Sequence, residues 1–170
     1  PKSRYQGLFG YQGGIKTINL GLINPVVIGS NCVGALYAAS YNQGLSNCYV
    51  EGGYVKGSDT VGGLVGSLNY SSANYFYTTC EVEGVSNVGG VVGWTNRDIL
   101  NSFSSGDTEG ETSVGGVLGS GGAKMTNCAV YGSVNGVNNV GIFIGWAGVY
   151  AKLSDSNYNL NVNKTLSCIG

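Results

Sequence analysis

The six residues Val61–Gly66, with the sequence VGGLVG, form a motif that recurs along the chain. The other copies are YQGLFG at Tyr5–Gly10, VGALYA at Val33–Ala38, VGGVVG at Val88–Gly93, VGGVLG at Val114–Gly119 and VGIFIG at Val140–Gly145. Their first residues, at positions 5, 33, 61, 88, 114 and 140, are separated by 28, 28, 27, 26 and 26 residues. Such a period is typical of solenoids, in which each repeat forms one coil that stacks on the preceding coil.

Three further columns emerge when the copies are aligned on this motif. A valine column, with one threonine, stands six residues before it and predicts an inward stripe whose neighbours point outward. A glycine column four residues before it predicts either a turn with positive φ or a position too tight for a Cβ. An asparagine column thirteen or fourteen residues before it predicts a ladder of amides at a bend. The three columns are Val27, Val55, Val82, Thr108 and Val134; Gly29, Gly57, Gly84, Gly110 and Gly136; and Asn19, Asn47, Asn74, Asn101 and Asn127.

These columns predict an all-β fold, a parallel β-solenoid (β-helix) of about six coils with 26–28 residues per coil. At ~3.3 Å per residue a coil has a perimeter of at most about 90 Å, which fits two or three short strands. The doubled glycine of VGGLVG indicates that two walls of the coil approach closely. We expect one domain over residues 1–170, with 153–170 as a divergent last coil or cap. A leucine-rich repeat is disfavoured because its LxxLxLxxN pattern is missing.

The composition excludes several classes of function. Gly accounts for 31 of 170 residues, whereas only 10% of residues are charged and His is absent. Without His there is no His-based catalytic triad and no His-ligated zinc. A net charge of −1 is too small for a nucleic-acid-binding surface. No apolar run approaches the ~18 residues that a membrane span needs.

Two parts of the repeat resemble the GLUG motif. Gly7–Gly10 and Gly63–Gly66 match its G-L-[VF]-G phrase, and Ile15–Asn24 and Leu45–Gly52 look like its second half. GLUG-motif repeats occur in secreted bacterial adhesin-like proteins and in non-catalytic regions of IgA-specific metallopeptidases. The resemblance implies an extracellular or cell-surface location and a stalk or binding role. It transfers no catalytic residue.

Acidic residues gather in two adjacent coils. Glu81 aligns with Asp107 and Glu83 with Glu109, and Glu111 extends the group. Oxygen ligands without His or Cys suit a hard cation, so a calcium site is one interpretation. A solvated acidic patch is the interpretation that the pattern favours. Paired carboxylates for glycoside cleavage are a third, weaker reading.

Aromatic residues suggest a second candidate site. Trp94 and Trp146 directly follow two copies of the motif, and Tyr11 shares their column. An exposed aromatic row could stack against sugar rings. The alternative is that these rings only cover a turn.

The five cysteines form no CxxC pair. Cys48 and Cys128 share a column three coils apart, about 14 Å at the spacing of strands, which is too far for a disulfide. Pairing of Cys32 with Cys48 or Cys80 stays open, and most of the thiols are expected to be small buried residues.

These observations favour a non-enzymatic structural or adhesive module of a secreted or cell-surface bacterial protein. The alternatives are a carbohydrate-binding module with an aromatic face and a filament subunit that stacks end to end. Its partners would be neighbouring domains or identical subunits at the coil ends, with a host glycan or protein as a further candidate. A polysaccharide-degrading enzyme and an ice-binding protein rank last, the latter because no threonine ladder forms.

Overall fold

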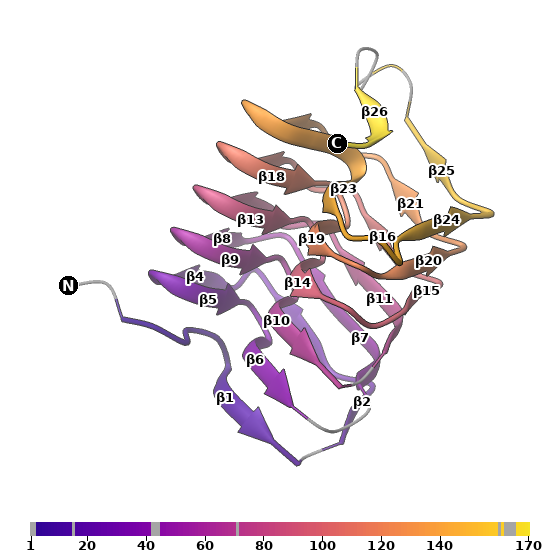
Figure 1. Cartoon of the computed structure of the whole chain (residues 1–170). Helices are drawn as coiled ribbons and strands as arrows, with labels where there is room; N and C mark the ends of the chain where they lie inside the picture. Colours follow the sequence, from indigo (N-terminus) through magenta and orange to yellow (C-terminus); the bar gives the residue numbers. More distant parts are fainter. Residues whose placement is uncertain (1–2, 15, 42–44, 71, 160, 162–165) are drawn as a thin grey trace.

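The recurring motif forms the inner wall of a parallel β-solenoid of about six coils (Figure 1). We describe residues 3–14, 16–41, 45–70, 72–159, 161 and 166–170 of a computed structural model. Within these residues all regular structure is β-strand, and no helix could cross a membrane. Of the segments named above, Ile15 and residues 160 and 162–165 lie outside the described residues.

The first sheet contains the motif, which supplies two stacks of strands. One stack lies before the Gly–Leu turn of the motif and the other after it, and the long strand β23 belongs to both. The strands of the first stack are β5 (Asn31–Gly34), β9 (Asp59–Gly62), β13 (Ser86–Gly89), β18 (Thr112–Gly115) and β23 (Asn138–Ala147). Those of the second are β1 (Phe9–Gly13), β6 (Tyr37–Tyr41), β10 (Val65–Asn69), β14 (Val92–Thr95) and β19 (Leu118–Gly121).

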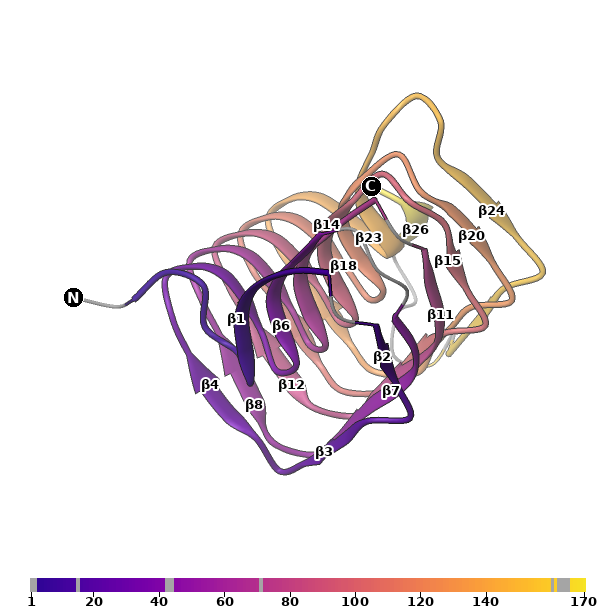
Figure 2. The same ribbon diagram turned by 90° about the horizontal axis from the view of Figure 1, so that it is seen from below.

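Two outer sheets complete each coil. Figure 2 shows β1 and β6 between β4 and β8 on one side and β7 and β11 on the other. The longer outer sheet holds β2 (Thr17–Ile18), β3 (Gly21–Ile23), β7 (Leu45–Glu51), β11 (Ala73–Thr78), β15 (Ile99–Leu100), β16 (Phe103–Ser104), β20 (Lys124–Thr126), β21 (Ala129–Val130), β24 (Lys152–Ser154) and β25 (Asn157–Tyr158). The shorter one holds β4 (Val26–Ile28), β8 (Tyr54–Lys56), β12 (Glu81–Glu83), β17 (Thr108–Glu109) and β22 (Val134–Asn135).

The motif is buried on both faces, which explains why its apolar residues do not alternate. Every residue from 61 to 68 is buried, glycines included. A Cβ on Gly89 would lie 2.7 Å from the nitrogen of Gly119 in the next coil and closer still to the carbonyl oxygen of Val92. The two walls therefore touch main chain to main chain, as the doubled glycine predicted.

The glycine column is confirmed as a place too tight for a Cβ. An added Cβ on Gly84 would lie 2.6 Å from Cγ2 of Val88, and the other members meet valines of the motif in the same way. None of the five adopts a positive φ, so of the two alternatives for this column the close approach holds and the left-handed turn does not. The valines that open the motif fill the corner, and a second side chain has no room there.

Left-handed backbone occurs instead at two other columns. One is the residue before the first inner-wall residue of each coil, which is a valine or, in the first coil, Gln6; φ lies between 51° and 57° at Tyr5, Cys32, Thr60, Asn87, Ser113 and Asn139. The other is the asparagine column, with φ between 51° and 60° at Asn19, Asn47, Tyr75, Asn101, Asn127 and Asp155. Asn and Asp tolerate this region better than other side chains because their short polar groups bond locally.

The asparagine ladder is present with one correction. Nδ2 of Asn47 donates to Oδ1 of Asn19 at 2.6 Å, and Nδ2 of Asn127 donates to Oδ1 of Asn101 at 2.8 Å. In the coil between them, however, Asn74 pairs with Ser46 and Leu100, and Tyr75 takes the left-handed position. The Asn74 side chain still reaches the ladder, because its Oδ1 accepts from Nδ2 of Asn101 at 2.9 Å.

The first coil differs from the expected register, and the segment after the last copy of the motif extends the solenoid. Gln6, rather than Tyr5, bridges Val33, whereas Phe9 pairs with Tyr37, so the first copy of the motif is one residue shorter. At the other end, Lys152 and Asn157 continue the longer outer sheet in register with Lys124 and Ala129. The last strand, β26 (Ser167–Ile169), pairs with β23.

The valine column points inward as predicted. Val55, Val82, Thr108 and Val134 are buried, and Val27 is half-buried in the first coil. A single apolar core runs along the solenoid between the inner wall and the two outer sheets, and it includes Phe76, Met125 and Phe143.

The tightness of the inner wall predicts a large penalty for a single methyl group. We expect Gly89→Ala to lower the free energy of unfolding by at least about 3 kcal/mol, because its Cβ meets main-chain atoms that cannot move aside. Urea denaturation followed by circular dichroism measures the change. Gly13→Ala is the matched control, since its Cβ would meet nothing within 4 Å. Equal stabilities of the two variants would contradict main-chain contact between the walls.

Candidate functional site

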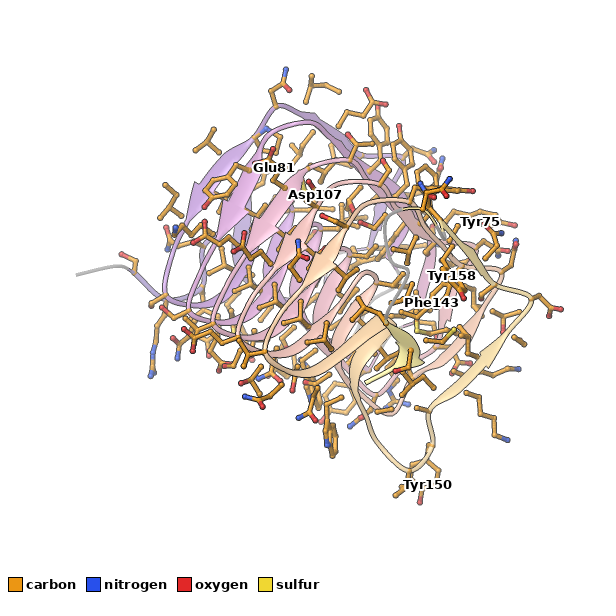
Figure 3. All side chains as sticks on the ribbon, turned by 90° about the horizontal axis from the view of Figure 1, so that it is seen from above. Tyr75, Glu81, Asp107, Phe143, Tyr150 and Tyr158 are labelled. Carbon is orange, nitrogen blue, oxygen red and sulfur yellow. The ribbon has the colours of Figure 1, made fainter. Side chains whose placement is uncertain are left out.

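The acidic residues lie where the alignment placed them. Glu83 pairs with Glu109 and Val82 with Thr108, so Glu81 stands beside Asp107 (Figure 3). Together with Tyr54 these side chains line a shallow hollow of about 210 Å³ on the shorter outer sheet.

Each pair of acids has polar partners within the protein. Glu83 accepts hydrogen bonds from Nζ of Lys56 and from the hydroxyl of Tyr54. The bond to Glu83 is the main cause that raises the pKa of Lys56. Asp107 accepts from the backbone N–H of Ser133 at 2.8 Å and from its hydroxyl at 2.7 Å. Like charges one coil apart are thus offset by neighbouring donors.

The calcium prediction finds no support in this arrangement. Within the described residues, no group of three or more Asp, Glu or Cys side chains converges as a metal site requires. Glu81, Glu109 and Glu111 are exposed, and the backbone N–H of Glu111 bonds to Val85 in the preceding coil. The geometry fits a solvated acidic patch.

A stacked aromatic ladder covers the longer outer sheet. The rings of Tyr49 and Tyr77 lie 4.9 Å apart at 3°, and those of Tyr77 and Phe103 lie 5.1 Å apart at 5°. The ring of Tyr131 then meets Phe103 edge-on at 6.3 Å. The sequence alignment did not identify this ladder, although the 26-residue step from Tyr77 leads to Phe103.

The tryptophan column is confirmed as a column but not as a continuous aromatic row. Pairing runs in order through Tyr11, Ala39, Ser67, Trp94, Ser120 and Trp146. Small residues separate the rings, and Tyr11 lies three coils away from Trp94. Tyr11 instead packs against Tyr5 and Tyr41, with ring centroids 5.8 Å and 5.0 Å apart.

Trp94 and Trp146 meet at one cleft, which we call the tryptophan cleft. It encloses about 530 Å³. Its described lining residues are Trp94, Asn96, Arg97, Gly122, Trp146, Gly148, Val149 and Tyr150. Figure 3 shows Tyr150 at the tip of a turn, far from Glu81 and Asp107. The two tryptophans come from the fourth and sixth coils, and Gly122 of the fifth coil lies between them.

The cleft is apolar and exposed at the same time. Trp146 is 51% exposed, Tyr150 80% and Val149 93%, whereas Trp94 is half-buried. Arg97 stands at the rim, with its guanidinium carbon 5.6 Å from the centroid of the Tyr70 ring. These described residues offer flat apolar faces and a cation, with neither a carboxylate nor a thiol among them. The chemistry of this lining suits packing against an apolar face and pairing with an anion.

All five cysteines are free, so the pairing of Cys32 with Cys48 or Cys80 that the sequence left open does not form. Cys48, Cys80 and Cys128 are buried in the core. Burial raises the pKa of the Cys80 thiol to about 12, which makes it a poor nucleophile and metal ligand at neutral pH.

Comparisons of this chain with protein-family models, with curated proteins and with solved structures find no match.

The aromatic ladder predicts an unusual tyrosine titration. A hydrogen bond from Tyr77 to the Glu51 carboxylate raises the pKa of Tyr77 to about 12. Above pH ~10 an unfolded tyrosine ionises while folded Tyr77 keeps its proton, so its contribution to stability is lost as the pH rises from about 10 to about 12. Glu51→Gln should move the midpoint down, towards the ordinary value of a tyrosine.

Carbon NMR of the tyrosine Cζ atoms measures this titration. Tyr77→Phe identifies the resonance without removing the stacked ring. A Tyr77 midpoint that is the same with and without the Glu51 carboxylate would contradict the proposed cause.

Proposed function

We propose that this chain is a non-enzymatic structural and adhesive repeat module of a secreted or cell-surface bacterial protein, similar to GLUG-motif proteins. We propose further that it adheres by binding a saccharide at the tryptophan cleft. The observation that carries the second part is the convergence of Trp94, Trp146 and Tyr150 on one exposed hollow.

Support for a structural role comes from the hydrogen bonds between coils. Parallel pairing connects each coil to the next in all three sheets. The asparagine ladder and the stacked rings of Tyr49, Tyr77 and Phe103 repeat the same contacts outside the core. Such a stack is stiff along its length because every coil restrains its neighbours.

Support for a binding role comes from the exposure of the cleft. Large aromatic side chains exposed next to each other on a soluble surface commonly mark an interaction site. A volume of about 530 Å³ is within the range of small-ligand sites. Sugar rings have apolar C–H faces that pack on indole and phenol rings, while their hydroxyls stay hydrogen-bonded.

A glycan array tests the saccharide-binding proposal. We expect the wild-type chain to bind, and Trp146→Ala to weaken binding about tenfold or more, because one wall of the cleft is removed. Tyr131→Ala is the matched control: Tyr131 is 49% exposed against 51% for Trp146, but it directly follows β21 of the longer outer sheet, away from the cleft. An array on which the wild-type chain gives no signal would contradict the proposal that the cleft binds a saccharide.

End-to-end stacking is a second candidate function, favoured by the surface at the first coil. Leu8, Val26 and Ile28 are 55%, 71% and 51% exposed there, and they line a hollow of about 480 Å³. Strand β4 is the last strand of its sheet, so its outer edge can accept another strand. A second copy of the chain, seated as a further coil, would cover both.

Sedimentation at increasing protein concentration tests this stacking. We expect the wild-type chain to form larger species as concentration rises and Leu8→Glu to stay monomeric, because a carboxylate would be buried in the contact. Val85→Glu is the control, since Val85 is 45% exposed at a turn in the middle of the stack. A wild-type chain that is monomeric at every concentration excludes this candidate.

A further inference from the structure

The floor of the tryptophan cleft lacks side chains. Gly122 and Gly148 occupy positions where the fourth coil has Asn96. A Cβ on Gly122 would lie 3.3 Å from Oδ1 of Asn96 and 3.7 Å from Cβ of Tyr150, and it would meet no other atom closer than 4.0 Å. This glycine is therefore packed less tightly than the inner-wall glycines, which are pressed against the main chain.

The two tryptophans flank this floor at a distance set by the coils. Trp94 and Trp146 both pair with Ser120, so they lie two coils apart, about 9.6 Å at ~4.8 Å per coil. In the filled ladder, by comparison, Tyr49, Tyr77 and Phe103 place one ring in each coil, with centroids 4.9 and 5.1 Å apart. In the coil between them this column holds Ser120, which is buried and does not line the cleft, so the space for a ligand lies beside the tryptophans, at Gly122.

The charge at the rim is positive. Arg97 is exposed, and within the described part of the chain the single ion pair is that of Lys56 with Glu83, on another sheet. The adjacent Asp98 is exposed but does not line the cleft. The guanidinium carbon of Arg97 lies over the Tyr70 ring, 5.6 Å from its centroid, in a cation–π contact. An arginine held against a ring beside an apolar hollow suits a carboxylate, which it can bind through two parallel N–H groups.

We propose that the tryptophan cleft binds an acidic saccharide. One sugar ring enters the hollow lined by Gly122 and Tyr150 and packs against the tryptophans, and its carboxylate bonds to Arg97. This inference rests on the proposed function and specifies the ligand class of the same site.

The chain provides its own probe for this binding. Trp94 and Trp146 are its two tryptophans, and both line the cleft, so tryptophan fluorescence reports on this site alone. We would titrate the protein with α-1,4-linked galacturonic acid trisaccharide and with the matching neutral galactose trisaccharide. The two ligands differ in the carboxylates.

The wild-type chain should bind the acidic trisaccharide at least about tenfold more tightly than the neutral one, the factor that one charged hydrogen-bonded pair supplies. Added salt should reduce this preference. Arg97→Gln should abolish it without weakening neutral binding, while Arg97→Lys should retain part of it. Gly122→Leu should abolish binding of both ligands, because its side chain fills the floor, and urea denaturation checks that the variant is folded.

Four results would overturn the inference. Equal binding of the two trisaccharides, or an acid preference that survives Arg97→Gln, removes the role of charge and leaves the saccharide-binding proposal standing. Full binding by Gly122→Leu places the ligand elsewhere. If neither trisaccharide binds, the acidic ligand is excluded for this cleft, and the glycan array with Trp146→Ala decides the broader proposal separately.

Discussion

Main-chain contact between the two walls of motif strands is the constraint on which the rest of the solenoid depends. The motif is buried on both faces, so each of its peptide groups needs a partner inside the protein. Neighbouring coils supply these partners: the N–H of Leu64 bonds to the carbonyl of Val91 at 3.0 Å, and that of Val91 to Val117 at 3.1 Å. Glycine keeps the walls close enough, and valine fills the corners that glycine leaves.

This constraint separates the positions of a coil into two kinds. At the inner wall and at the glycine column, size decides which residue is allowed, so glycine returns at the tightest positions and apolar residues return beside it. On the outer faces, side chains meet mainly their counterparts one coil away, so different chemistries follow one another along the same column. Tyr54, Glu81 and Asp107 form one such series, and Lys56, Glu83 and Glu109 form the next.

Much of the fold could be predicted from the sequence, because parallel stacking converts a repeat period directly into contacts. The pairing of Glu83 with Glu109 and the column shared by Trp94 and Trp146 follow from steps of 26 residues each. The assignment of Asn74 failed because alignment by residue identity preferred an asparagine to the adjacent Tyr75. The column is defined by its left-handed backbone conformation. Either residue can adopt this conformation, at a cost in conformational energy.

The binding surface was harder to predict than the fold. The tryptophans were visible because they follow the motif, but Tyr150 and Val149 lie beyond its last copy. Gly122 and Gly148 contribute by having no side chain. In a chain with 31 glycines, two more do not mark a binding site in the sequence. The ladder of Tyr49, Tyr77 and Phe103 was not predicted for another reason. Its members all have aromatic rings, but they are not the same residue type.

The direction of the hydrogen bonds between coils has a mechanical consequence. These bonds point along the solenoid axis, so a pull along that axis strains them directly and can detach one coil at a time. A pull across the axis is instead carried by the covalent chain as it winds round each coil. The walls of the tryptophan cleft come from the fourth and sixth coils, so a load applied at the cleft is spread over three neighbouring coils. The molecule therefore resists forces across the solenoid axis better than forces along it.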